Sequence, residues 1–140
     1  MSGDGRFIVF ESYASNLVSG DDNFSEDIFV FDRNDDSIIN ITAGGNAGSY
    51  GATISDDGNA VLFRSSASNF AVGDQASTPD VFLWTRGSGI TILTAGSTYN
   101  NGLEASISGD GSTAVFMSSG EYLSAQQVVD GYKDLFLIDL

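Results

Sequence analysis

Ser2-Gly3-Asp4-Gly5 stands at the start of the chain, and this pattern returns as Ser55-Asp56-Asp57-Gly58 and as Ser108-Gly109-Asp110-Gly111. Each return comes 53 residues after the previous one. When residues 2–33 are aligned with 55–86, 13 of the 32 positions are identical. The chain is therefore built from internal repeats. We bound them at 2–54, 55–107 and 108–140, within a single domain that covers 1–140.

Short apolar segments recur within each repeat and predict strands. They lie at 7–10, 28–31 and 38–41 in the first copy, at 60–63, 81–84, 90–93 and 104–107 in the second, and at 114–117 and 135–138 in the third. The strongest of them are apolar at nearly every position, so both faces of each sheet must be covered. No helical pattern is available to supply the crossovers of a parallel sheet.

This pattern predicts an all-β protein of the β-propeller type, with about three four-stranded antiparallel blades and about ten strands. The first copy lacks its leading strand and the third lacks its last strand. Closed propellers have about 4–8 blades. We therefore expect an incomplete or open propeller, or part of a larger ring that is closed by a longer chain or by self-association.

A resemblance to a known family rests on residues that recur in register. Ala14-Ser15-Asn16-Leu17, Gly20-Asp21 and Asp27-Ile28-Phe29 recur in the second copy as Ala67-Ser68-Asn69, Gly73-Asp74 and Asp80-Val81-Phe82. Together with the Ser-x-Asp-Gly pattern, they resemble the TolB-like (WD-related) β-propeller repeat, in a subgroup found in secreted and surface proteins of bacteria. The resemblance implies a propeller fold and an extracellular, cell-surface or periplasmic location.

The charge balance excludes several classes of function. The chain of 140 residues has 19 Asp and Glu against 5 Lys and Arg, so its formal net charge is −14. A nucleic-acid interface or adhesion to an anionic membrane needs a basic surface, which five cations cannot supply. No run of residues is apolar and long enough for membrane insertion. Without His or Cys, the remaining metal chemistry uses oxygen ligands and points to calcium.

The acidic segment 21–27 is the best candidate for a metal site. Its oxygen-bearing side chains alternate at Asp21, Asn23, Ser25 and Asp27, a spacing that lets a curled loop turn its oxygens inward around calcium. The glycine and distal glutamate of an EF-hand are absent. Less complete sets occur at Asp74 and Asp80, and at Asp130 and Asp134. The alternative is that these acids bind backbone N–H groups in turns and at strand starts.

Other repeated residues fit structural roles. The Asp-Gly pairs are typical of two-residue hairpin turns, in which glycine takes a positive φ and aspartate binds the local backbone. Trp84 aligns with Phe31 and is expected in the core between blades. Arg33 and Arg86 match in register, and we expect both to bind turn carbonyls.

The acids belong to the repeat pattern, whereas a catalytic pair should break it, so we expect no enzyme activity. The sequence favours a non-catalytic binding or scaffold module with a protein partner. Two alternatives stay open. One is an accessory propeller of a larger, prolyl-peptidase-like hydrolase, and the other is a carbohydrate-binding module with a glycan ligand.

Overall fold

The computed structural model describes residues 1–72, 74, 79–94, 104–118, 126–127 and 134–140. These residues form eleven strands in three antiparallel sheets. The described residues contain no helix that is long and apolar enough to cross a membrane. The all-β prediction is confirmed. The sheets are offset from the repeats by one strand, because Ser49–Ile54 and Ala105–Ile107, at the ends of repeats 2–54 and 55–107, join the sheets formed by the second and third copies.

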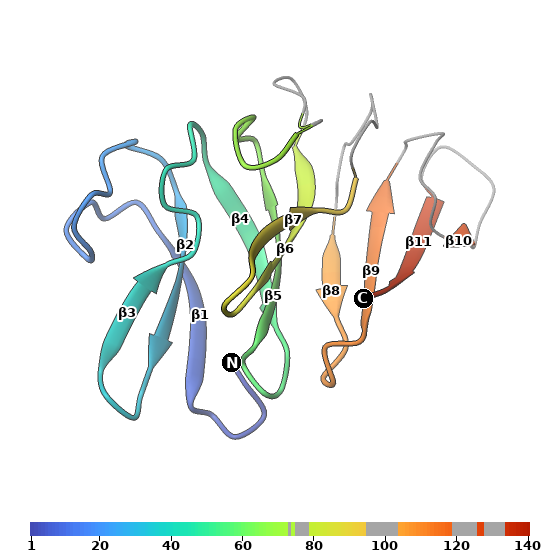
Figure 1. The fold of residues 1–140 in the computed structure, drawn as a ribbon, viewed down its shortest axis with the longest axis horizontal. Coiled ribbons are helices and arrows are strands. Elements are labelled where there is room, and N and C mark those ends of the chain that lie inside the picture. The colour runs from blue at the N-terminus through green and yellow to red at the C-terminus, as the bar shows by residue number, and fades with distance from the viewer. Residues whose placement is uncertain (73, 75–78, 95–103, 119–125, 128–133) are drawn as a thin grey trace.

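The three sheets stand side by side as blades, in chain order from blue to red (Figure 1). Blade 1 has the order β1-β2-β3, blade 2 has β4-β5-β6-β7, and blade 3 has β8-β9-β11-β10. The strands of blade 1 are β1 Phe7–Ser12, β2 Asp27–Asp32 and β3 Ser37–Asn40. Those of blade 2 are β4 Ser49–Ile54, β5 Ala60–Ser65, β6 Asp80–Thr85 and β7 Gly89–Ile92. Those of blade 3 are β8 Ala105–Ile107, β9 Thr113–Ser118, β10 Gln126–Gln127 and β11 Asp134–Asp139.

A stacked pair of phenylalanines marks the same register in every blade. Phe10 is paired with Phe29, Phe63 with Phe82, and Phe116 with Phe136. Their ring centroids lie 5.4, 5.6 and 5.7 Å apart. Since the same cross-strand pair recurs in all three sheets, the repeats seen in the sequence are repeats of structure.

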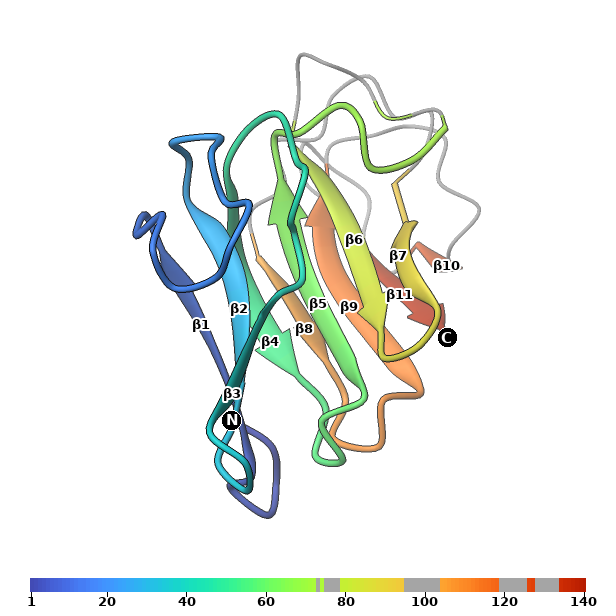
Figure 2. The same ribbon diagram turned by 60° about the vertical axis from the view of Figure 1, so that its left-hand side comes forward.

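Two hydrophobic cores lie between the blades, whose arrangement one behind the other can be followed in Figure 2. Val61, Phe63 and Trp84 of blade 2 belong to the core shared with blade 1. Leu62 and Val81, on the opposite face of the same sheet, belong to the core shared with blade 3. Both faces of blade 2 are therefore covered, which explains why its strands are apolar at nearly every position. The expected core position of Trp84 is confirmed.

The strand count departs from the prediction at one edge. The outer position of blade 3, expected to be empty, is taken by β10, which pairs with β11 through Gln126 and Gln127. An exposed strand edge carries unpaired N–H and C=O groups, and here a neighbouring part of the chain satisfies some of them. The polar pair of glutamines carries no apolar signal, so the sequence pattern gave no reason to expect a strand.

The Ser-x-Asp-Gly turns adopt one hydrogen-bonded structure in all three copies. In the second copy, Ser55 Oγ donates to Asp57 Oδ1 at 2.6 Å and accepts from the N–H of Ala60 at 3.0 Å. The N–H of Gly58 donates to the carbonyl of Ser55 at 3.0 Å, and Gly58 has φ of +72°. The positive φ and the local bonding of aspartate are as predicted.

The predicted two-residue loop is wrong. The N–H of Ser55 donates to the carbonyl of Ala60 at 2.9 Å, so four residues, 56–59, form the loop. The serine hydroxyl supplies the additional bonds that a loop of this length needs.

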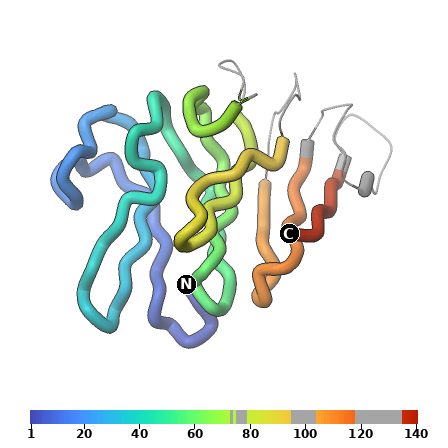
Figure 3. The backbone as a smooth tube through the Cα atoms, in the orientation of Figure 1, coloured from blue at the N-terminus to red at the C-terminus, as the bar shows by residue number. Residues whose placement is uncertain are grey.

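These turns also join the blades to one another. The N–H of Gly3 donates to the carbonyl of Asp56 at 2.9 Å, and the N–H of Asp56 donates to that of Gly109 at 2.7 Å. As expected, Arg33 donates to the carbonyl of Gly5 and Arg86 to that of Gly58. One end of the molecule is thus a continuous structural network, which lies at the bottom of the traced backbone (Figure 3).

Candidate functional site

The acidic segments lie at the opposite end of the blades from the Ser-x-Asp-Gly turns (Figures 1 and 2). One follows β1 and leads into β2, and the second follows β5 and leads into β6. Both β2 and β6 begin with an aspartate, Asp27 and Asp80, each of which is 1% exposed. The repeat therefore places a buried carboxylate at the base of each segment.

Each of these carboxylates is held by a buried threonine from the segment that follows the next strand. Thr42 Oγ1 donates to Asp27 Oδ1 at 2.6 Å and accepts from the N–H of Ile28 at 3.0 Å. Thr94 makes the equivalent bonds to Asp80 and to the N–H of Val81. The threonine relieves part of the cost of burying a charge and fixes one carboxylate oxygen. In the first copy, the second oxygen, Asp27 Oδ2, faces the acidic segment and accepts from Asn23.

Asn23 closes the loop of the first copy. Its Nδ2 donates to Asp27 Oδ2 at 3.2 Å and to the carbonyl of Gly45 at 3.1 Å. Its Oδ1 accepts from the N–H of Ser25 at 2.9 Å. A carboxylate oxygen and a carbonyl oxygen therefore converge on one point, where the side-chain amide nitrogen lies.

A hollow of about 260 Å³ surrounds this point. It is lined by Gly20, Asp21, Asp22, Asn23, Asp27, Asn40, Gly44, Gly45 and Asn46. The structure thus brings together three of the four residues predicted from the sequence. The fourth, Ser25, does not line the hollow, and its hydroxyl donates to the carbonyl of Asn23 at 3.3 Å.

The carboxylates of each pair repel one another. Burial and the charge of Asp27 raise the pKa of Asp21. In the second copy, burial and the charge of Asp80 raise the pKa of Asp74 to about 6, and both carboxylate oxygens of Asp74 are shielded from solvent. A cation placed between such carboxylates would remove the repulsion. Among the described residues, no three acidic side chains gather at one point, so further ligands would be amide and carbonyl oxygens.

Residues of blade 2 bond the backbone of the loop that lines this hollow. Asn69 Nδ2 donates to the carbonyl of Gly44 at 2.7 Å, and its Oδ1 accepts from the N–H of Asn46 at 3.0 Å. The ring of Phe70 lies where a side chain at position 45 would lie, 2.6 Å from a Cβ built on Gly45. This contact fixes the backbone that presents the Gly45 carbonyl. It also gives a physical role to the repeated Ala-Ser-Asn motif.

Sequence reasoning missed Thr42 and Thr94. A signal was present, because both begin a Thr-Ala-Gly sequence that occurs at 42–44 and again at 94–96. In the third copy, Asp134 begins β11, where its backbone is paired with Ser118. Asp130 lies outside the described residues. The metal-site prediction for these two residues stays a prediction.

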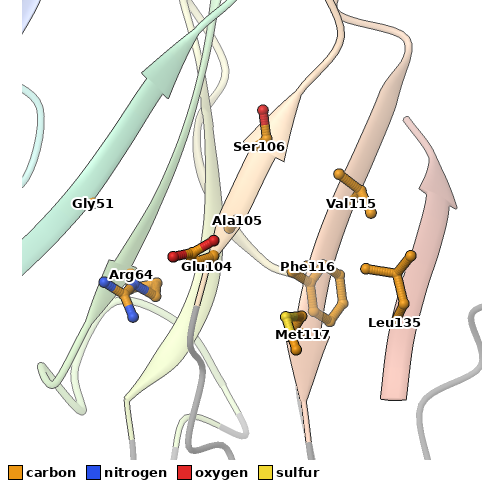
Figure 4. A pocket seen from close by; sticks show the side chains of 9 residues that line it. All are labelled: Gly51, Arg64, Glu104, Ala105, Ser106, Val115, Phe116, Met117 and Leu135. Carbon is orange, nitrogen blue, oxygen red and sulfur yellow. The ribbon is translucent and has the colours of Figure 1, made fainter. Parts of the chain in front are cut away.

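A second hollow, of about 350 Å³, lies between blades 2 and 3 (Figure 4). Arg64 and Glu104 lie on one side of it, across from Val115 and Leu135. Arg64 and Glu104 hold the repeat positions of Glu11 and Gly51. Between blades 1 and 2, the carboxylate of Glu11 accepts the N–H of Gly51 at 2.7 Å. Blades 2 and 3 therefore carry a different pair of residues at the position that joins blades 1 and 2, and Glu104 is the one carboxylate among the residues that line this hollow.

No family model and no curated protein sequence matches the chain. Solved structures do match. A putative TolB from Agrobacterium tumefaciens matches 99% of this chain at 17% identity with a TM-score of 0.56. TolB from Acinetobacter baumannii matches 97% at 21% identity with a TM-score of 0.59. The tricorn protease matches 99% at 14% identity with a TM-score of 0.60.

The chain spans only 43%, 30% and 13% of these three proteins, respectively. The likeness is one of fold. It confirms the predicted TolB-like β-propeller architecture, with three blades contributed by residues 1–140.

Proposed function

We propose that this chain is a non-catalytic β-propeller module that binds a protein partner, with calcium as the ligand that stabilises its acidic loop end. The observation that carries the calcium proposal is the convergence of Asp27 Oδ2 and the Gly45 carbonyl on one point, beside a second carboxylate whose pKa is raised. Calcium accepts carboxylate, amide and carbonyl oxygens in flexible geometry. The ligands would be Asp21, Asn23, Asp27 and the carbonyl of Gly45.

Binding would replace the contact that Asn23 makes now. Its Nδ2 donates to both converging oxygens, so a cation at this point requires the amide to turn and present Oδ1. This competition and the small number of carboxylates favour a weak site, of the kind with a dissociation constant of about 10⁻⁴–10⁻³ M that is common in extracellular modules. Such an affinity agrees with the extracellular, surface or periplasmic location that the family resemblance implies.

The test is a calcium titration followed by calorimetry and by thermal unfolding. At a calcium concentration of 100 times the dissociation constant, linkage adds about 2.7 kcal/mol of stability. We expect Asp21→Asn to weaken binding at least about tenfold, because it removes one of two carboxylates. Asp36→Asn is the matched control, since it makes the same charge change in the β2–β3 turn, where Asp36 has φ of 56°. Asparagine tolerates that backbone conformation.

Two results would contradict the calcium proposal. One is the absence of binding heat and of stabilisation at 10 mM calcium. The other is an equal loss of affinity in Asp21→Asn and Asp36→Asn, which would show an effect of net charge alone. The partner-binding part of the proposal is separate, and a failure of calcium binding would leave it standing.

A second candidate is an accessory propeller of a larger hydrolase. The specific observation in its favour is the likeness to the tricorn protease, of which this chain spans 13%. The gene segments that flank residues 1–140 would discriminate between the two, since a Gly-x-Ser-x-Gly nucleophile motif within them supports this candidate.

A further inference from the structure

The hollow beside Asp27 is acidic and carries no cation of its own. Its walls hold the carboxylates of Asp21, Asp22 and Asp27 together with the carbonyl of Gly45. All four arginines of the chain lie among the described residues, and none of them lines the hollow. With a volume of about 260 Å³, the hollow has room for far more than a single ion or water. A larger group with positive charge is therefore expected to fit it.

The chain itself shows which kind of donor suits the converging oxygens. Asn23 Nδ2 is part of a planar NH₂ group, which donates to Asp27 Oδ2 at 3.2 Å and to the carbonyl of Gly45 at 3.1 Å. The terminal nitrogen of a guanidinium is also a planar NH₂ group, and it adds a positive charge. A guanidinium can therefore replace the amide of Asn23 at the same distances, whereas calcium needs its oxygens at about 2.3–2.6 Å.

The wall of the hollow also holds a donor that no described group uses. Asn40 lines the hollow, and its Nδ2 is buried without a hydrogen-bond partner among the described residues. The amide cannot be reversed, because Asn40 Oδ1 accepts from the N–H and from the hydroxyl of Thr42. A buried donor without a partner is costly. The occupant is therefore expected to bring an acceptor as well as a cation, as a peptide with its carbonyl groups does.

An exposed aromatic residue next to this loop indicates a protein as the source of the cation. Phe24 follows Asn23 in the chain and is 88% exposed, and aromatic residues are enriched in protein–protein interfaces. A second copy of this chain is disfavoured as the partner, because two chains of net charge −14 repel each other. The same charge favours a partner with a basic surface.

We propose that the hollow lined by Asp21, Asp27 and Asn40 binds an arginine side chain of a partner protein. The guanidinium displaces the amide of Asn23 and donates to Asp27 Oδ2 and to the carbonyl of Gly45. The carboxylate of Asp21 accepts from the same guanidinium, and a backbone carbonyl of the partner accepts from Asn40 Nδ2. This inference rests on the proposed partner binding and uses the same hollow as calcium, so the two occupants exclude each other.

The test is an NMR titration with acetyl-arginine amide, which carries a guanidinium and peptide carbonyls. Acetyl-citrulline amide is its neutral analogue of the same shape. We expect the arginine probe to bind at least about tenfold more tightly, because its hydrogen bonds to carboxylates are charge-assisted. The side-chain amide signals of Asn23 and Asn40 should shift, whereas that of Asn34, in the turn between β2 and β3, should not.

Two variants test the two kinds of contact. Asp21→Asn should weaken binding of the arginine probe at least about tenfold, and Asp36→Asn, in the turn between β2 and β3, is the control with the same change of charge. Asn40→Asp keeps the acceptor that Thr42 uses and removes the unpartnered donor. It should strengthen binding of methylguanidinium, a bare cation, and reduce the advantage of acetyl-arginine amide over it.

Equal affinities for the arginine and citrulline probes, or equal losses in Asp21→Asn and Asp36→Asn, would overturn the proposal. Calcium separates it from the calcium proposal. Binding of calcium without binding of acetyl-arginine amide contradicts the arginine site alone, and the reverse result contradicts the calcium site alone. Binding of both without competition also contradicts the arginine site, because one hollow cannot hold both. Failure of the arginine probe leaves partner binding elsewhere on the module standing.

Discussion

The two ends of the blades use aspartate in opposite ways. At the turn end, Asp57 accepts hydrogen bonds from Ser55 and Asn59, and these bonds lower its pKa. At the loop end, burial and the charge of Asp80 raise the pKa of Asp74 to about 6. The same residue type is stabilised as an anion in one place and destabilised in the other.

This difference indicates that the aspartates of the turn end have a structural role and that those of the loop end belong to the candidate site. The turns satisfy their carboxylates with donors from the same turn, so they need nothing further. The loops bring two carboxylates together and direct oxygens at a hollow. A cation bound there would reduce the repulsion between the two carboxylates. A carboxyl group whose pKa is raised by burial and by a neighbouring carboxylate is typical of functional sites. Changes at the turn end should therefore alter stability and how it falls in acid, whereas changes at the acidic residues of the loop end should alter the response to calcium and the dependence of stability on pH between 4 and 6.

The largest effect is expected from Gly58→Ala at the turn end. Gly58 has φ of +72°, and a Cβ there would lie 2.0 Å from the ring of Phe7 in the neighbouring blade. The strained backbone and the clash together should cost about 3 kcal/mol of unfolding free energy. Gly87→Ala is the control, because Gly87 has φ of +85° with nothing within 4 Å. It should cost about 1 kcal/mol. Urea unfolding measures both, and equal losses would show that the contact between blades contributes nothing.

The next effect is expected from Thr42→Val and Thr94→Val at the loop end. Each change removes the hydroxyl that donates to a buried carboxylate and should cost about 2 kcal/mol. Thr53→Val is a matched control, since no described group bonds the buried Thr53 hydroxyl, and it should be neutral or slightly stabilising. A loss in Thr53→Val as large as in Thr42→Val would mean that threonine shape, and not its bond to Asp27, is what matters.

A smaller effect of opposite sign is expected from Asp74→Asn. Because the pKa of Asp74 in the folded chain is about 6, above its ordinary value of 3.8, the folded state binds the proton more tightly than the unfolded state. The stability of the native chain should therefore fall as pH rises from about 4 to about 6. At pH 7, Asp74→Asn should add about 1 kcal/mol after allowance for solvent screening.

Unfolding curves at several pH values test this. The variant should lose the slope between pH 4 and 6 and should match the native chain below pH 4. A variant less stable than the native chain at pH 7 would show that Asp74 is a net stabilising anion, contrary to the repulsion inferred here.

The sequence predicted the repeated parts of the molecule and missed the parts that lie between repeats. The 53-residue period, the Phe10, Phe63 and Phe116 register and the Asp-Gly glycines all follow from local patterns, and the structure confirms them. The recurring Thr-Ala-Gly sequence marks Thr42 as a repeated residue, but it does not show that Thr42 bonds Asp27, because Thr42 follows a different strand. The loop that carries Gly45 is held by Asn69 of the next blade. Which residues of neighbouring blades contact one another depends on how the blades pack, and the 53-residue period alone does not specify this.

The smallest effect is expected from Asp110 at the turn end of blade 3. Bonds from Ser108 and Ser112 lower the pKa of Asp110 from 3.8 to about 2. The unfolded chain therefore takes up this proton first, and the contribution of Asp110 to stability is complete above pH 4 and is lost as pH falls toward 2. Asp110→Asn should be slightly less stable than the native chain above pH 4, and this difference should close at lower pH. An NMR titration of the carboxyl group checks the pKa directly.

Ser112→Ala should raise the pKa of Asp110, because it removes one donor of the turn. It should not change the dependence of stability on pH between 4 and 6, which Asp74 produces. A change in this dependence would show that the two ends of the blades are coupled, which the separation of their hydrogen-bond networks argues against.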